Sequence, residues 1–115
     1  MQRSFRLTRS TDFKRVRRNG KSYAHPLLVL IALENEDSLS TTRVGVAAGR
    51  SVGNAVKRNR AKRLIRAATQ ELYPQIKLGY DLVLIARAPI IQVKMPVLRT
   101  ALQELLLRAN LRKNV

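Results

Sequence analysis

Apolar residues recur at helical spacing in two long stretches of the chain. From Asn54 to about Tyr73, five apolar side chains fall within roughly 100° of a helical wheel, and Pro74 closes the predicted helix. These side chains are Ala61, Leu64, Ile65, Ala68 and Leu72. The stretch from about Pro96 to Leu111 repeats the pattern with Leu98, Ala101, Leu102, Leu105, Leu106 and Ala109. The spacing therefore predicts two amphipathic helices, each with one face toward a core.

A shorter helix is predicted near the start of the chain. Ser10 is suited to be its N-cap, Asp12 suits the positive end of a helix, and Asn19-Gly20 is a stop signal. Phe13 and Val16 lie on one side of this helix. We therefore expect a short and very basic first helix that packs through these two side chains.

Three apolar runs are too short for helices and predict strands. They are residues 22–33, which Pro26 interrupts, residues 43–48 and residues 80–87. Residues 34–42 hold three of the seven acidic residues and predict a solvated loop, so we expect the first two strands to form a hairpin with a long connection. The glycines of the GRSVGN segment that follows permit a tight backbone path into the long helix.

The order of these elements is αββαβα, which predicts an α+β sandwich around a central mixed sheet. The chain has 115 residues, 45% of them hydrophobic, which is enough for one core. It shows no internal repeat and no low-complexity tract. We therefore expect residues 1–115 to form a single domain.

The charge of the chain limits the classes of partner that the protein is expected to bind. The 23 Lys and Arg residues exceed the 7 Asp and Glu residues, so the formal net charge is +16. Such a surplus on a folded surface favours binding to polyanions, with nucleic acid ahead of an anionic membrane. The lack of cysteine excludes disulfides, a thiolate nucleophile and thiolate-ligated zinc. With no apolar run long enough for a signal peptide or a membrane span, we expect a cytoplasmic protein without membrane association, although the basic leader leaves an organellar transit sequence as the alternative.

The cations concentrate on the long predicted helix. Six of the ten residues from Lys57 to Arg66 are Lys or Arg. Five side chains occupy about 140° of the wheel opposite the apolar arc, and Arg60 lies on the flank. These five are Arg58, Asn59, Lys62, Arg63 and Arg66.

Local helix stability does not explain this pattern, because like charges at i and i+4 destabilise a helix by about 0.2–0.5 kcal/mol a pair. A solvated face would mix acids with bases, yet no acid occurs here before Glu71. Guanidinium groups match phosphate oxygens and stack on bases, and the Asn59 amide can bond to a base edge or to the backbone. The helix is therefore predicted to bind the phosphates of a nucleic acid.

The sequence resembles the protein subunit of bacterial ribonuclease P over almost its whole length. The resemblance rests on RVGVAAGRSVGNAVKRNRAKRLIRAA at residues 43–68, on RLTRSTDFKRVRRNGKS near the start and on YDLVLIARAP near the end. Its most specific feature is the RNR triplet that follows a Gly-Asn turn at the start of a helix.

The resemblance implies a fold like domain 2 of ribosomal protein S5, with a left-handed crossover around the RNR helix. It also implies an RNA-based endonuclease that removes the 5′ leader of precursor tRNA, in which the catalytic RNA and its Mg²⁺ ions perform the hydrolysis. The protein would bind the catalytic RNA and the leader, raise the affinity for precursor tRNA and lower the magnesium requirement.

The family's functional residues can be placed on matching positions of this chain. The positions expected to bind the catalytic RNA are Arg58, Asn59, Arg60, Lys62, Arg63 and Arg66. The positions expected in a leader-binding cleft between the first helix and the sheet are Phe13, Arg15, Val16, Arg17 and Tyr23. Arg17, Leu28 and Ile31 replace aromatic residues of that cleft, and Arg50-Ser51 replaces a basic pair. We therefore expect leader contacts that depend more on charge than on stacking.

No residue is predicted to be catalytic. Asp12, Asp81 and Glu104 are isolated, while Glu34, Glu36 and Asp37 share the expected loop. The single histidine, His25, stands beside a proline where a structural role is favoured. No side chain is assigned to a metal, and the oligomeric state is left open. The alternatives are a structural RNA-binding module such as a ribosomal protein, a membrane-surface helix and, less favoured, sequence-specific DNA binding.

Overall fold

A computed structural model describes residues 5–35 and 41–113 of the chain. Its helices are α1 (Ser10–Asn19), α2 (Ala55–Leu72) and α3 (Met95–Arg108). Its strands are β1 (Lys21–Ala24), β2 (Leu28–Glu34), β3 (Arg43–Ala48) and β4 (Tyr80–Ala86). Short 3-10 helices follow β3, α2 and β4, namely η2 (Arg50–Val52), η3 (Tyr73–Gln75) and η4 (Ala88–Gln92). Within the described residues, no helix is both long and apolar enough to cross a membrane.

The four strands form one mixed sheet in the order β1-β2-β4-β3. β2 is antiparallel to both β1 and β4, whereas β3 is parallel to β4. The predicted α+β class and mixed sheet are confirmed. The predicted single strand over residues 22–33 is two strands, because the chain reverses at Pro26, which has no N–H to donate to a ladder. The order of elements is therefore αβββαβα.

The predicted hairpin between residues 22–33 and 43–48 is wrong. β4 lies between β2 and β3 and pairs with both. Its side chains are buried on both faces, as suits the centre of a sheet. Of the acidic loop expected at residues 34–42, Glu34 is the last residue of β2, while residues 36–40 lie outside the described part of the chain.

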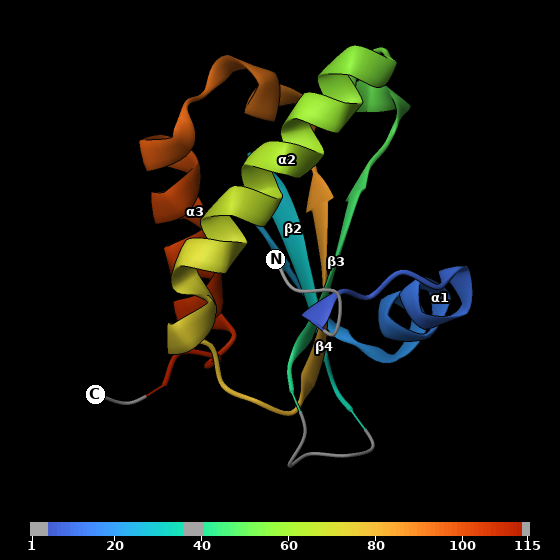
Figure 1. Ribbon diagram of the computed structural model, residues 1–115, viewed down its shortest axis with the longest axis vertical. Helices are drawn as coiled ribbons and strands as arrows, with labels where there is room; N and C mark the ends of the chain where they lie inside the picture. The colour runs from blue at the N-terminus through green and yellow to red at the C-terminus, as the bar shows by residue number, and fades with distance from the viewer. Residues whose placement is uncertain (1–4, 36–40, 114–115) are drawn as a thin grey trace.

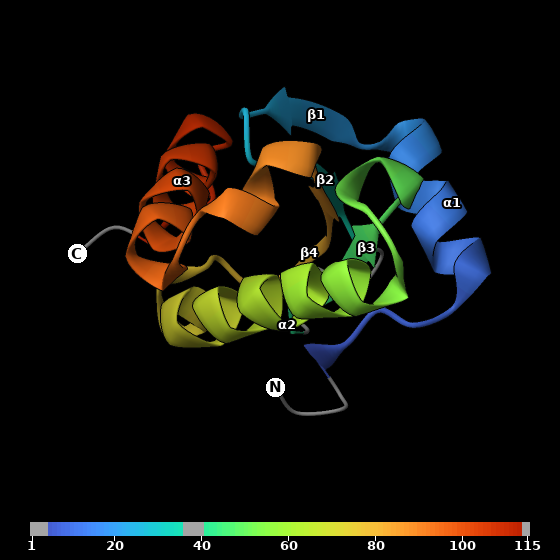
Figure 2. The ribbon, with the colours of Figure 1, turned by 90° about the horizontal axis from the view of Figure 1, so that it is seen from above.

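The connection from β3 to β4 runs through α2. In Figure 1 α2 lies in front of the sheet, and in the upper half of that view β4 lies to the left of β3. Figure 2, seen from above, also places α2 on the side of the sheet that faces the viewer of Figure 1. The crossover is thus left-handed, as the family resemblance implies, although about 98% of such connections are right-handed.

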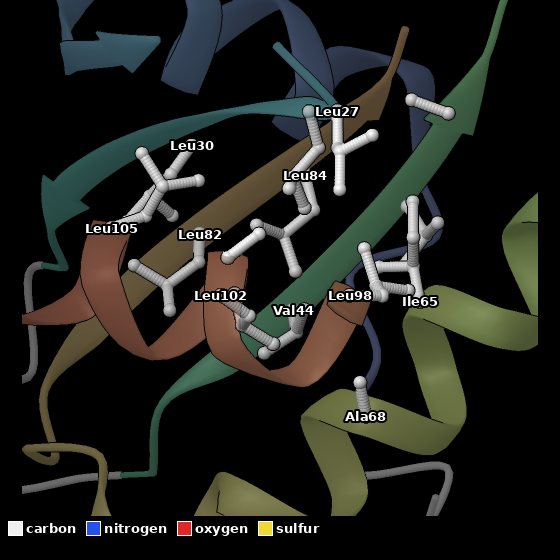
Figure 3. Packing of buried hydrophobic residues seen from close by; sticks show 14 of the residues in the cluster. Leu27, Leu30, Val44, Ile65, Ala68, Leu82, Leu84, Leu98, Leu102 and Leu105 are labelled. Carbon is white, nitrogen blue, oxygen red and sulfur yellow. The ribbon is translucent and has the colours of Figure 1, made fainter. Parts of the chain in front are cut away.

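Helices cover both faces of the sheet, and α1 lies on the side opposite α2 and α3 (Figure 2). The larger cluster joins α2 and α3 to the inner face of the strands, and Figure 3 shows Ile65, Leu98 and Leu102 within it. The residues of α2 and α3 expected to face the core are buried, apart from the half-buried Leu64 and Ala109. On the other face, Leu7 and Val16 form a small cluster with Ile31 and Val83, against which Phe13 packs.

The beginnings of the helices follow two different patterns. α2 has a side-chain cap, since the Asn54 Oδ1 accepts a hydrogen bond from the Lys57 N–H at 3.0 Å. Gly53 precedes this cap and has a φ of 135°, a backbone conformation that residues other than glycine rarely adopt. For α1 the predicted cap is wrong: Ser10 is the first helical residue, and the N-cap is Arg9, whose side chain makes no capping hydrogen bond. The carbonyl of Arg9 accepts the first bonds of that helix instead.

The N-terminal segment runs along the outer edge of β3. The Leu7 N–H donates to the Val44 carbonyl at 2.9 Å, and the ring of Phe5 stacks on Tyr73 with centroids 4.6 Å apart. In space, the segment therefore runs from beside Tyr73, at the C-terminal end of α2, to the start of α1.

Gly45 allows α1 to approach the sheet closely. A Cβ at this position would lie 2.6 Å from the ring of Phe13, whereas a Cβ at Gly49 would meet nothing within 4 Å. We expect Gly45→Ala to reduce the free energy of unfolding by about 1–3 kcal/mol through overpacking. Gly49→Ala is the matched control and should change it by less than about 0.5 kcal/mol. Urea unfolding of the two variants checks this, and equal stabilities would contradict the assigned contact.

Candidate nucleic-acid interface

The long helix presents its polar side chains away from the core. Asn59, Arg60 and Arg63 are exposed on its outer side, and Arg58, Lys62 and Arg66 form a half-buried row along one flank. We call these six residues the α2 ridge. Packing of the opposite apolar side determines this orientation, because Ala61, Ile65, Ala68 and Leu72 are all buried.

The α2 ridge has no carboxylate partner within the described residues. The nearest acid along the helix, Glu71, bonds instead to Arg99 of α3 at 2.6 Å. The other ion pairs of the described residues also leave the ridge free. Its positive charge is thus available to an external anion.

Two cavities border α2. On one flank, Arg66 and Phe13 line a cavity of about 200 Å³ at the edge of β3, together with Leu7 and Val46. On the other flank, Arg60 lines a cavity of about 120 Å³ against η4. The first cavity brings together Phe13 and Arg66, which the sequence assigned to two separate surfaces.

The predicted leader-binding residues of α1 have different surroundings. Phe13 is half-buried, Arg17 is exposed, and Val16 is fully buried beneath the helix. Val29 and Ile85 are half-buried on the same face of the sheet. We use the name α1 surface for Phe13, Arg17, Val29 and Ile85. Val16 supports this surface from beneath.

Tyr23 and Leu28 lie on the opposite face of the sheet from α1. Leu28 is fully buried in the larger cluster, and Tyr23 packs against that cluster. The expectation that Leu28 and Ile31 line one cleft is therefore wrong, because residues three apart on a strand point to opposite faces. The structure likewise does not bring Tyr23 together with Phe13. Lys21 of β1 places its Nζ 5.8 Å from the centroid of the Tyr23 ring.

An ion cluster joins α1 to the sheet. The carboxylate of Asp81 is fully buried and accepts hydrogen bonds from Arg43 at 3.0 and 2.8 Å and from Arg15 at 2.5 Å. Arg15 also bonds to Asp12 at 3.3 Å. Burial by itself would raise the pKa of Asp81, but the hydrogen bonds from Arg43 and Arg15 outweigh it and hold that pKa below its ordinary value.

In the sequence Asp81 stands as an isolated acid, and Arg15 is an expected leader contact. The one available signal was an acid at the start of an apolar run that predicts a buried strand. Its partners could not be named from that signal, because Arg43 and Arg15 are distant in sequence and meet Asp81 only through strand pairing and helix packing.

The family model for ribonuclease P matches residues 1–110 of this chain. This chain belongs to the ribonuclease P protein family. Membership makes it a protein component of ribonuclease P, a ribonucleoprotein of tRNA processing, and a partner of the ribonuclease P RNA. It also favours this function over that of a structural ribosomal protein.

Relatives in the family match nearly the whole chain. The ribonuclease P protein component of Herpetosiphon aurantiacus is 40% identical over 111 residues, which cover 96% of this chain and 89% of that protein. The component from Oceanobacillus iheyensis is 37% identical and covers 99% of this chain and 93% of its own length.

Solved structures of ribonuclease P proteins share the fold. The protein from Staphylococcus aureus superposes with a TM-score of 0.84 at 28% identity, covering 95% of this chain and 98% of that one. The protein from Thermotoga maritima gives a TM-score of 0.79 at 29% identity, covering 90% and 96%.

The described acidic side chains are spread apart or bound to arginines, and this bears on where Mg²⁺ could be held. Among residues 5–35 and 41–113, no three His, Asp or Glu side chains gather closely enough to hold a metal ion. Asp81 and Asp12 bind arginines, and Glu71 binds Arg99. We therefore assign Mg²⁺ to no side chain of the described residues.

The ion cluster predicts a specific pH dependence. Because the folded-state pKa of Asp81 lies below the ordinary 3.8, its stabilisation is present above that pH and is lost as the pH falls through the lowered pKa. At neutral pH, Asp81→Asn should reduce the free energy of unfolding by about 1–3 kcal/mol. Urea unfolding over a pH series should show this gap constant above 3.8 and closing below it. A gap independent of pH would contradict the assignment.

Proposed function

We propose that this protein binds the ribonuclease P RNA through the α2 ridge and the 5′ leader of precursor tRNA through the α1 surface. The RNA and its Mg²⁺ ions would cleave the leader, and the protein would raise substrate affinity and lower the magnesium requirement. The assembly would work in the cytoplasm. The observation that carries the proposal is the α2 ridge, whose cations have no carboxylate partner among residues 5–35 and 41–113 and lie on a helix packed against the core.

The geometry of the α2 ridge suits an RNA backbone. From Arg58 to Arg66 the helix rises about 12 Å, so the cations can reach several phosphates at once. The cap at Asn54 and the buried apolar side keep the helix in place before RNA arrives, which reduces the entropy lost on binding. The exposed amide of Asn59 adds a group that can bond to a base edge.

The α1 surface suits a single strand. Phe13 offers one ring for stacking, while Arg17 and the half-buried Val29 and Ile85 supply a charge and an apolar floor. Because Arg17 and Ile31 replace the aromatic residues expected from the family, charge should contribute more to leader binding here than stacking.

Each surface faces a different anionic partner. A protein with a net charge of +16 between a catalytic RNA and its precursor reduces their mutual repulsion. Less magnesium is then needed for the two RNAs to approach each other. Affinity for the precursor and magnesium dependence should therefore change together.

Binding of the catalytic RNA should be strongly salt-dependent. If the five cations of the α2 ridge and the neighbouring Lys57 displace condensed counterions, affinity should fall roughly a thousandfold between 50 and 200 mM salt. Filter binding over a salt series measures this slope. A slope that corresponds to fewer than about two ion contacts would remove the main support for the α2 ridge.

Leader removal should depend on the α2 ridge at low magnesium. We expect the Arg58→Ala, Arg60→Ala, Arg63→Ala triple variant to lose processing activity with its RNA at physiological magnesium and to regain it at high magnesium. The charge-matched control replaces Arg108, Arg112 and Lys113 at the end of α3 and beyond, and it should retain activity. An equal loss in both variants would indicate a nonspecific charge effect, and processing by the polypeptide alone would refute the proposed division of labour.

A further inference from the structure

Asp81 connects three separate elements of the protein. It lies on β4, opposite Arg43 of the parallel strand β3, and Arg15 reaches it from α1. Among the described residues it is the one buried side chain that carries a charge. The side chains of Arg15 and Arg43 remain 33% and 38% exposed, so the cluster lies at the rim of the α1 contact rather than in its centre.

Stability alone is a weak reason for this arrangement. Burying a charge requires desolvation, and replacing a buried ion pair with apolar residues is often neutral or stabilising. What the cluster supplies is direction, because Arg43 binds both oxygens of the carboxylate and thereby fixes the side on which Arg15 can bond.

α1 depends on such a directional contact. Within this helix Val16 is the one fully buried residue, so the apolar contact with the sheet is small. A small apolar contact by itself restricts rotation and sliding of α1 only in part. Arg15 lies two residues after Phe13 and two before Arg17, so its bond to Asp81 restricts both neighbours.

We propose that Asp81 is a positioning residue for leader binding. By holding Arg15, it fixes α1 on the sheet so that Phe13 and Arg17 face the leader. Arg15 acts within this cluster and does not contact RNA itself. The inference rests on the proposed function of the α1 surface.

An effect of charge and an effect of positioning predict different changes in RNA binding for Asp81→Asn. Asp81→Asn removes a negative charge and frees two guanidinium groups, so charge alone would leave RNA binding equal or stronger. Loss of positioning would weaken the preference for a substrate with a leader. The sign of the change therefore separates the two explanations.

The experiment compares the affinity of the reconstituted holoenzyme for a precursor tRNA with its affinity for the same tRNA without a leader. We expect Asp81→Asn to reduce this affinity ratio about fivefold, a coupling typical of residues in one network. Its affinity for the catalytic RNA should stay unchanged. The matched control is Glu71→Gln, which also removes one negative charge from an ion pair but lies away from α1, and it should keep the wild-type ratio.

A second variant keeps the inference testable if Asp81→Asn folds poorly, which circular dichroism would detect. Arg15→Gln leaves Asp81 bound to Arg43 and should reduce the ratio by a similar factor. Its leader-dependent salt slope should match the wild type, whereas loss of a direct phosphate contact would lower that slope by about one. The double variant should be no worse than either single variant.

The two proposals fail in different ways. A wild-type holoenzyme without leader preference would refute the proposed function and this inference with it. A wild-type preference that Asp81→Asn and Arg15→Gln both retain would overturn the positioning role alone. A lowered salt slope for Arg15→Gln would also overturn it, because Arg15 would then contact the leader.

Discussion

The two apolar faces of the sheet constrain where everything else in this protein can lie. β4 is buried on both sides, so helices must cover both faces, and each helix must turn its apolar side inward. Charge is thereby driven to the outer sides of the helices. With 23 basic residues in 115, the outer side and one flank of α2 carry the five cations of the α2 ridge.

Packing allows α2 to tolerate the repulsion between its cations. Burial of Ile65 or Leu72 contributes about 1.5–3 kcal/mol each, whereas a like-charge pair along the ridge costs about 0.2–0.5 kcal/mol. Core packing therefore outweighs the repulsion within the α2 ridge, whose cations have no carboxylate partner in the part of the chain that the structure describes. The same balance explains why the helix begins at a strong cap, since an isolated helix of this composition would be marginal.

The face beneath α1 is organised differently. The apolar contact between α1 and the sheet is small. The close approach at Gly45 and the buried carboxylate of Asp81 together define one orientation of α1. Phe13 of α1 and Arg66 of α2 line the same cavity, so the two candidate RNA surfaces are neighbours. A bound leader and a bound catalytic RNA would then lie side by side, as their proposed reaction requires.

The sequence by itself determined the helices, the α+β class, the cations of the α2 ridge and the family, because periodicity, charge and short motifs are local properties. It placed the N-cap of α1 at Ser10, one residue too late, and could not show that β4 separates β2 from β3. Strand order depends on which apolar run is buried on both faces, and that is decided by the packing of distant elements. The faces of Tyr23 and Leu28 required the strand register, which Pro26 sets by dividing one apolar run into two strands. Only the tertiary structure brought Asp81, Arg43 and Arg15 together, since a buried charge selects its partners by spatial proximity and not by position along the chain.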